Sequence, residues 1–193
     1  NWAGSGDAGT EKIWFELNEK LPATEFLGYN TLKTEAQVTA LVQDGKEVSE
    51  VSNGEFFLLT NQTPFYGEMG GQVGDKGKIT GKDLEIEVTD TKKKLDGLYV
   101  HIAKIVKGHI KNGDIVLMEV CESNRKAIEA NHTVTHLLHH ALQEKFGASV
   151  TQKGSMVAAE RMRFDIAYPK QISENELRDL EDTVNGLIRQ NLK

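Results

Sequence analysis

The sequence predicts an α+β fold, in which a small β-barrel-like unit precedes a two-layer unit of helices and strands. Three observations support this prediction. Strand-like runs separated by turn residues recur between residues 38 and 121. After Glu122 the apolar period changes to that of a helix. Two further strand-like runs then lie between this helix and a second one near the end of the chain.

The first segment, residues 1–31, is interpreted as a short helix with linker sequence on both sides. Ile13, Trp14, Leu17 and Leu21 recur at helical spacing. Pro22 is expected to end this helix because proline lacks a backbone N–H. We find no pattern of catalytic residues in this segment.

Residues 32–121 are predicted to form the barrel-like unit. Alternating apolar residues lead up to Asp44-Gly45, and this dipeptide predicts a hairpin turn. Further strands are expected at residues 55–60, 84–90, 98–106 and 114–121. Short strands at this spacing favour a small barrel or a sandwich. Cys121 ends an apolar strand, and we expect it to be a small buried hydrophobe.

Residues 122–193 are predicted to form the second unit. The pattern indicates a long helix over residues 124–146, strands over 149–157 and 162–167, and a final helix. Ser173 and Glu176 have the spacing of a capping box at the start of that helix. Since no partner strand follows the final helix, we expect this unit to be incomplete at its C-terminal end.

Composition and charge exclude several classes of protein. The chain of 193 residues has 23 Lys and Arg against 29 Asp and Glu, a net charge of −6, so bulk positive charge is not a means of binding nucleic acid. No apolar run of about 18 residues predicts a membrane span. One Cys forms no internal disulfide and no secretion signal opens the chain, so we predict a cytoplasmic location.

Four of the six histidines lie between His132 and His140, on the predicted helix over residues 124–146. At 100° per residue, Ala130, Leu137 and Leu138 fall in the apolar sector, whereas His132, His136 and His139 fall opposite. The i, i+4 pair of His132 and His136 suits one metal ion beside a helix. A His-rich solvated face is the alternative. Because Thr133 follows His132, the general-base Glu of a zincin protease is missing.

A catalytic zinc site usually takes three protein ligands and one water, so two histidines are not enough. The other candidates in the chain are the side chains of Cys121, His101, His109, His139 and His140. None has ligand spacing relative to His132, and the predicted site is therefore short of ligands.

A glycine-rich stretch over residues 63–77 contains five glycines between strand-like runs. Such a loop lets backbone amides approach a phosphate or a small polar group. It has neither a P-loop ending nor the helix start of a dinucleotide fingerprint, which disfavours nucleotide binding. The alternative is a series of tight turns at the rim of a barrel.

Three motifs in this order resemble the editing domain of alanyl-tRNA synthetase. They are residues 62–75 (QTPFYGEMGGQVGD), residues 131–138 (NHTVTHLL), and residues 152–155 (QKGS) with 163–165 (RFD). The resemblance covers about residues 26–193, and the helix before it is similar to the segment that joins the aminoacylation half to the editing half. The chain is thus expected to be an excised part of a synthetase.

The resemblance implies a zinc-dependent deacylase that hydrolyses Ser-tRNA(Ala) and Gly-tRNA(Ala). His132 and His136 match two of the four zinc ligands of the family. The other two belong to a Cys-x-x-x-His motif, which we expect after Lys193. The editing unit would have the second-additional-domain fold of these synthetases, and the parent enzyme would use ATP to attach alanine to tRNA(Ala).

The resemblance also suggests roles for single residues. Gln152 matches a position beside the substrate, and with Thr63 it would hydrogen-bond the seryl hydroxyl. Gly70 and Gly71 would let the loop backbone approach the aminoacyl end of the tRNA. Arg163 would face the 3′-terminal phosphates. The alternatives are an exposed strand position for Gln152 and an ion pair with Asp165 or Glu160 for Arg163.

The expected partners are the acceptor end of tRNA(Ala) and the rest of the synthetase chain. We expect no association with a membrane. One lysine-rich stretch would contact tRNA or form a solvated barrel edge; it consists of residues 92–94 with Lys104, Lys107 and Lys111. Two other functions stay open: a folded but inactive tRNA-contacting module, and a free-standing trans-editing deacylase.

Overall fold

The computed structural model describes residues 8–95, 97–147 and 149–190, and it divides them into two compact units. The first unit takes the described residues up to Met69 together with Val73–Glu122. The second takes Gly70–Gln72 and the described residues from Ser123 onward. Residues 1–7 of the predicted N-terminal segment, and the chain end at Lys193, lie outside the described residues.

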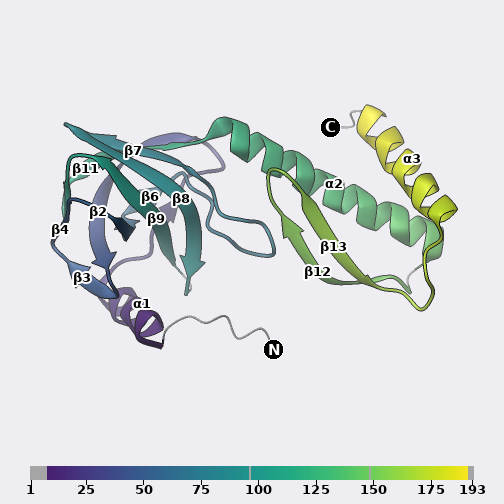
Figure 1. Ribbon diagram of the computed structural model, residues 1–193, viewed down its shortest axis with the longest axis horizontal. Coiled ribbons are helices and arrows are strands. Elements are labelled where there is room, and N and C mark those ends of the chain that lie inside the picture. The colour runs from purple at the N-terminus through teal and green to yellow at the C-terminus, as the bar shows by residue number, and fades with distance from the viewer. Residues whose placement is uncertain (1–7, 96, 148, 191–193) are drawn as a thin grey trace. The chain divides into compact units, whose positions relative to one another are not determined.

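The first unit consists of one helix and eleven strands, several of them only two residues long (Figure 1). Their bounds are α1 Ala8–Lys20, β1 Glu25–Phe26, β2 Lys33–Gln43, β3 Lys46–Val48, β4 Glu50–Val51, β5 Glu55–Thr60, β6 Gln62–Thr63, β7 Gly77–Gly81, β8 Leu84–Lys94, β9 Leu98–Lys107, β10 Ile110–Lys111 and β11 Ile115–Val120.

Six of these strands close into a barrel, in the order β11, β7, β8, β9, β5, β2, and β11 pairs with β2 to complete the ring. The closing pair is antiparallel and runs from Ile115 opposite Gln37 to Glu119 opposite Lys33. Of the two architectures that the strand spacing favours, the barrel is therefore the one confirmed. Closure leaves no free edge on these six strands, which removes sites for unwanted strand pairing.

The predicted hairpin at Asp44-Gly45 is confirmed. The two residues join β2 to β3, with Gln43 paired to Lys46. Both have positive φ, 51° for Asp44 and 73° for Gly45. This is the backbone that a two-residue turn needs in order to match the twist of its strands.

Alternation along the strands fills the barrel interior. In β8, Leu84, Ile86 and Val88 are buried while Glu85 and Glu87 are exposed. A second apolar cluster lies where α1 packs on the barrel, and it joins Trp14 and Leu17 of the helix to Ala40, Val42, Leu59, Leu98 and Val100. The apolar residues whose spacing predicts the helix thus form the face that the helix buries against the barrel.

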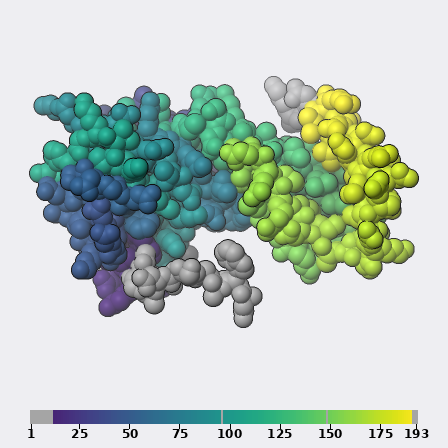
Figure 2. Space-filling view, in the orientation of Figure 1, coloured from purple at the N-terminus to yellow at the C-terminus, as the bar shows by residue number. Residues whose placement is uncertain are grey.

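The second unit consists of α2 Glu122–Phe146, the antiparallel hairpin of β12 Thr151–Val157 and β13 Met162–Ala167, and α3 Glu174–Gln190. Ala141 and Leu142 of α2 pack with Leu180 and Val184 of α3. Phe164 and Ile166 of β13 complete this apolar cluster. In the space-filling view the side chains of the hairpin adjoin those of α3 (Figure 2).

The capping box at the start of α3 is confirmed. The Ser173 hydroxyl and backbone N–H both donate to Glu176 Oε2, at 2.7 and 2.8 Å. These hydrogen bonds lower the pKa of the Glu176 carboxyl. The cap therefore begins the helix at the residue that the sequence indicates.

Two expectations about burial are wrong. Cys121 is exposed, because β11 ends at Val120 and the chain leaves the barrel there. Ala130 is exposed as well, since the apolar cluster of the second unit begins at Val134 on α2. None of the helices in the described ranges is long and apolar enough to cross a bilayer.

The imidazole of His101, on β9, lies wholly inside the barrel. Its Nδ1 lies 2.9 Å from the Leu58 carbonyl oxygen, which only accepts, so Nδ1 carries the proton. Its Nε2 therefore accepts from the Thr63 hydroxyl at 2.8 Å, and that hydroxyl in turn accepts the Phe65 N–H at 3.1 Å. Desolvation by burial lowers the pKa of His101 from 6.5 to about 4.

We predict a loss of barrel stability as the pH falls from about 6.5 to about 4. In that interval the unfolded chain binds a proton at position 101 and the folded chain does not, so the loss reaches about 3 kcal/mol. His101→Gln removes this dependence, and denaturant unfolding followed by tryptophan fluorescence measures it.

The matched control is His109→Gln, which replaces an exposed histidine of the same unit and keeps the wild-type pH profile. A ring titration of His101 by NMR provides a second measurement if the His101 variant does not fold. A midpoint near 6.5 for the folded protein would contradict the prediction.

Candidate functional site

Two histidines of α2 form the centre of the candidate site. His132 and His136 are one turn apart on the helix, and both are exposed. Their ring centroids are 4.9 Å apart, with a 37° angle between the planes. The proximity expected from their spacing is therefore present in the structure, and two imidazoles lie close enough to share one small ligand.

A glutamine that the sequence analysis does not single out orients one of these rings. Gln72 Oε1 lies 2.7 Å from His132 Nδ1. Because the amide oxygen only accepts, Nδ1 carries the proton and the lone pair remains on Nε2. Histidines that bind metals commonly donate their second N–H in this way, to an oxygen that holds the ring in place.

Gly70–Gln72 belongs to the second unit because β12 holds it there. The Val157 N–H donates to the Gly71 carbonyl at 2.8 Å, and Gln72 forms a parallel bridge with Val157. Gly71 has a φ of 88°, and a Cβ on it would lie 2.7 Å from Ser155 Oγ and overlap the Ser155 carbonyl oxygen. Only glycine suits both the backbone angle and the close approach.

Gln152 lies on β12, where the register against β13 shifts between Gln152 and Gly154. Its side chain is exposed, which agrees with the alternative interpretation of Gln152 as an exposed strand position. Its Nε2 donates to Ser155 Oγ at 3.3 Å. The amide therefore has a local partner within the hairpin, and it stands at the edge of the same site as the two histidines.

These groups surround a cavity of about 100 Å³, which holds a small polar group rather than a whole nucleotide. It is lined by Gly70, Gln72, His132, Thr135, His136, His139, Gln152, Ser155, Val157 and Phe164. The structure thus brings together four residues of the predicted site: Gly70, His132, His136 and Gln152. Gly71 contacts Ser155 of the same lining.

The lining also contains His139, which the sequence offers as a candidate ligand without ligand spacing, and Ser155 and Gln72, for which it predicts no individual role. His139 is half-buried, and its ring centroid lies 5.3 Å from that of Phe164. Ser155 accepts from Gln152. In the sequence, Gln72 is marked by its place in the motif of residues 62–75, directly after two glycines.

The two imidazoles are half of the four donors that a tetrahedral zinc site needs. Among the described residues no group of three or more His, Cys, Asp or Glu side chains is arranged to hold a metal ion. Both ring nitrogens of His101 are engaged inside the barrel, and His140 pairs with Glu144 at 3.7 Å. Two imidazoles suit zinc as two of its four ligands. One of them, His132, already has its Nε2 lone pair free for a metal because its Nδ1 donates to Gln72.

Thr63 and Arg163 do not line this cavity. Thr63 belongs to the barrel unit, where its hydroxyl bonds to His101 in the interior. Arg163 is exposed on β13, and its Nε lies 3.2 Å from Asp165 Oδ2, which is the ion pair named as the alternative for it. Their roles toward a seryl hydroxyl and toward phosphates stay predictions.

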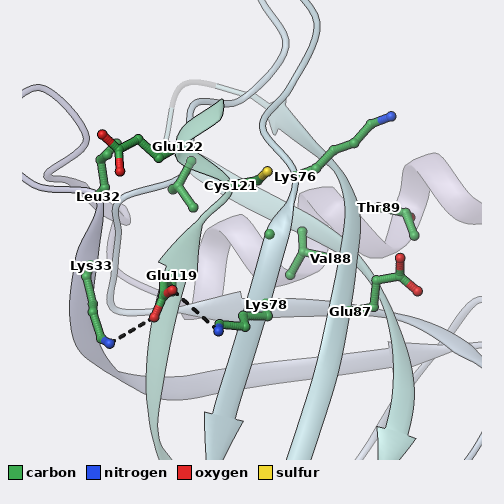
Figure 3. A pocket seen from close by; sticks show the side chains of 12 residues that line it. Leu32, Lys33, Lys76, Lys78, Glu87, Val88, Thr89, Glu119, Cys121 and Glu122 are labelled. Atoms are coloured by element: carbon green, nitrogen blue, oxygen red, sulfur yellow. Dashed lines mark ion pairs between the residues drawn. The ribbon is translucent and has the colours of Figure 1, made fainter. Parts of the chain in front are cut away.

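A larger cavity of about 760 Å³ lies in the barrel unit (Figure 3). The Glu119 carboxylate stands between Lys33 and Lys78, at 2.8 and 3.4 Å from their Nζ atoms. The hydrogen bond from Lys33 is the main cause that lowers the pKa of Glu119. This cavity is bordered by mutually paired charges, and its lining contains none of the predicted site residues.

Comparison with known proteins identifies the family. The family model described as "tRNA synthetases class II (A)" matches residues 3–124, more than half of the chain. It covers the barrel unit and the first turn of α2, so the histidine pair lies outside the matched part.

Two curated relatives extend the similarity to both units. The chain is 49 % identical over 192 residues to the alanine–tRNA ligase of Mesorhizobium japonicum (strain LMG 29417 / CECT 9101 / MAFF 303099). It is 50 % identical over 192 residues to that of Rhodopseudomonas palustris (strain ATCC BAA-98 / CGA009). Each match covers 99 % of this chain and 22 % of the relative, so the chain spans about a fifth of the length of these proteins. The chain belongs to the class II (A) tRNA synthetases, as a segment that resembles part of the alanine–tRNA ligases.

Proposed function

We propose that this chain is the editing part of an alanine–tRNA ligase, which hydrolyses Ser-tRNA(Ala) and Gly-tRNA(Ala) with the help of zinc. The observation that carries the proposal is the pair of imidazole rings, with His132 oriented by Gln72, beside Gln152 at a small polar cavity. The similarity to alanine–tRNA ligases supplies the class of substrate.

An enzyme that attaches alanine to tRNA needs an editing site separate from its alanine pocket, for a physical reason. A pocket sized for alanine rejects an amino acid that is one small group larger or smaller by only about 1–3 kcal/mol. A cavity of about 100 Å³ suits an aminoacyl side chain of that size. Hydrolysis at a separate site removes the errors that binding alone admits.

His132 and His136 would hold the zinc ion, His132 through Nε2 because Gln72 accepts from its Nδ1. When bound, zinc polarises the ester carbonyl and lowers the pKa of water. The remaining two ligands, a Cys and a His, would come from the longer protein. The hydrogen bond to Gln72 fixes both the tautomer and the orientation of the His132 ring, so the ring need not rotate before it binds a metal.

The other residues bind and orient the substrate in this proposal. Gln152 would exchange its hydrogen bond with Ser155 for one to the seryl hydroxyl. Gly70 and Gly71 would let the backbone approach the aminoacyl end. Arg163 would leave its exposed pair with Asp165 for a 3′-terminal phosphate, at small cost because exposed ion pairs contribute little. The role of Thr63 would need its hydroxyl to be released from His101.

The proposal extends to the longer protein. Its partners would be the acceptor end of tRNA(Ala) and the rest of the synthetase chain, which would use ATP to attach alanine. A cytoplasmic location fits this role.

We predict that His132→Ala and His136→Ala each abolish deacylation of Ser-tRNA(Ala) by the full-length protein. Loss of a residue that hydrogen-bonds a metal ligand lowers metal affinity or activity about 10- to 100-fold. Loss of the ligand itself should therefore lower activity at least about 100-fold. The zinc content per chain falls in parallel, and both quantities are measured on the same preparations.

His140→Ala is the matched control, because this exposed histidine lies on the same helix and outside the cavity lining. It leaves both quantities unchanged. Wild-type turnover in either ligand variant would overturn the metal assignment. If the wild-type protein leaves Ser-tRNA(Ala) intact at every zinc concentration, the inactive tRNA-contacting module is the correct alternative.

We also predict that Gly71→Ala is more harmful than Gly70→Ala. Both positions have positive φ, 88° and 62°, which costs an alanine about 1–2 kcal/mol. Only at Gly71 does the added Cβ also meet Ser155, whereas Gly70 has open space around it. The loop should therefore separate from β12 in Gly71→Ala alone.

Hydrogen exchange of the Val157 amide measures this separation directly, since it donates to Gly71. We expect exchange at least about tenfold faster in Gly71→Ala, because 1.4 kcal/mol corresponds to a factor of ten. Equal exchange in the two variants would contradict the packing argument.

A further inference from the structure

Four aromatic rings form a cluster on the barrel unit, which we call the aromatic platform: Phe26, Tyr29, Tyr66 and Tyr99. Phe26 is at its centre. Its ring stacks on Tyr99 with centroids 5.5 Å apart and 3° between the planes. Tyr29 and Tyr66 meet it edge to face, at 5.0 and 6.1 Å.

The backbone holds Phe26 in this position from two sides. Residue 26 pairs with Thr63, in the parallel contact between β1 and β6. The ring also lies against Gly28, where an added Cβ would come within 2.5 Å of two of its carbon atoms. A side chain at position 28 would displace the ring, so glycine there is what allows the rings to gather.

Packing within the barrel does not account for the outer part of the platform. Tyr29 is 85 % exposed, the largest value among the exposed large apolar and aromatic side chains described. It meets Phe26 in an edge-to-face pair, and its 85 % exposure leaves most of the ring open to solvent. An open aromatic face at the end of a row of supported rings is a surface on which a flat group can stack.

A positive charge lies beside these rings. Lys93 is opposite Tyr99 in the β8–β9 register, and its Nζ is 5.9 Å from the centroid of that ring. Its neighbour Lys92 is bound by Glu68 and Asp90. By contrast, Lys93 has no ion pair with any residue in the described part of the chain.

The phenol groups of Tyr66 and Tyr99 add no negative charge. Desolvation is the main cause that raises the pKa of both Tyr66 and Tyr99, and the nearby Tyr29 raises them further. Their hydroxyls therefore stay protonated near neutral pH and are able to donate hydrogen bonds.

We propose that the aromatic platform and Lys93 bind unpaired nucleotides of single-stranded RNA, with a base stacked on Tyr29 and a phosphate beside Lys93. Stacking faces next to a cation are the combination that recognises single strands, because every base has a π-face and every nucleotide a negative phosphate. The identity of this RNA as a tRNA 3′ end rests on the proposed function; the binding itself does not.

The test uses the full-length protein and two probes, a fluorescein-labelled single-stranded RNA of eight A and C nucleotides and a blunt RNA hairpin. Tyr29→Ala should weaken binding of the single strand by about 5- to 100-fold, as the loss of one stacked base predicts, and hardly affect the hairpin. Tyr29→Trp should retain the affinity. Phe15→Ala is the control, because Phe15 is also an exposed aromatic of this unit, at 58 %.

Lys93→Gln tests the phosphate contact. It should lower the slope of log affinity against log salt by about 0.7, as expected for one phosphate on a single strand. Lys82→Gln, an exposed lysine in the β7–β8 turn, should leave the slope unchanged.

Ultraviolet cross-linking locates the contact, since other parts of a long protein also bind RNA. Cross-links on the peptides that contain Tyr29 or Tyr99 support the platform. Their absence, or equal affinities of Tyr29→Ala and Phe15→Ala, overturns it, as does binding of a proline-rich peptide in place of RNA. His132→Ala separates the two proposals: it removes deacylation and leaves these cross-links in place.

Discussion

The pairing of β11 with β2 is the contact on which the barrel unit depends. It closes a ring of six strands and turns one face of each into an interior. The same closure places Glu119 directly across from Lys33 on one side and Lys78 on the other, which explains their ion pairs. Burial of His101 follows from it too, because the ring lies inside the closed wall with Thr63 and Leu58 as its partners.

The glycine-rich stretch serves two units and uses its glycines differently in each. Gly74, in the barrel unit, lies so close to β8 that an added Cβ would overlap the Thr91 carbonyl oxygen. Gly71 lies against Ser155 in the second unit. Through Gly71, the loop delivers Gln72 to His132, so a backbone requirement and the orientation of a candidate metal ligand are physically linked.

The two proposals assign different parts of a charged tRNA to the two sites, according to the chemistry of each site. The cavity around His132 and His136 is small and polar, which suits an aminoacyl group. The aromatic platform around Phe26 is open and flat, with Lys93 beside it, and suits bases and phosphates. Local arrangements of this kind are compatible with a net charge of −6, because they depend on a few side chains rather than on bulk charge.

Local signals in the sequence determined the elements. Apolar period, the Asp44-Gly45 turn and the Ser173–Glu176 cap act within a few residues, so strands β5 and β13 have the bounds expected and α3 begins where its cap predicts. The i, i+4 spacing also brought His132 and His136 together. Only the tertiary structure decided that the strands form a barrel instead of a sandwich and that Cys121 is exposed. It also decided which residues meet across long separations, as Gln72 meets His132 and Thr63 meets His101. These features depend on how strands close and loops fold back, and no local pattern encodes that geometry.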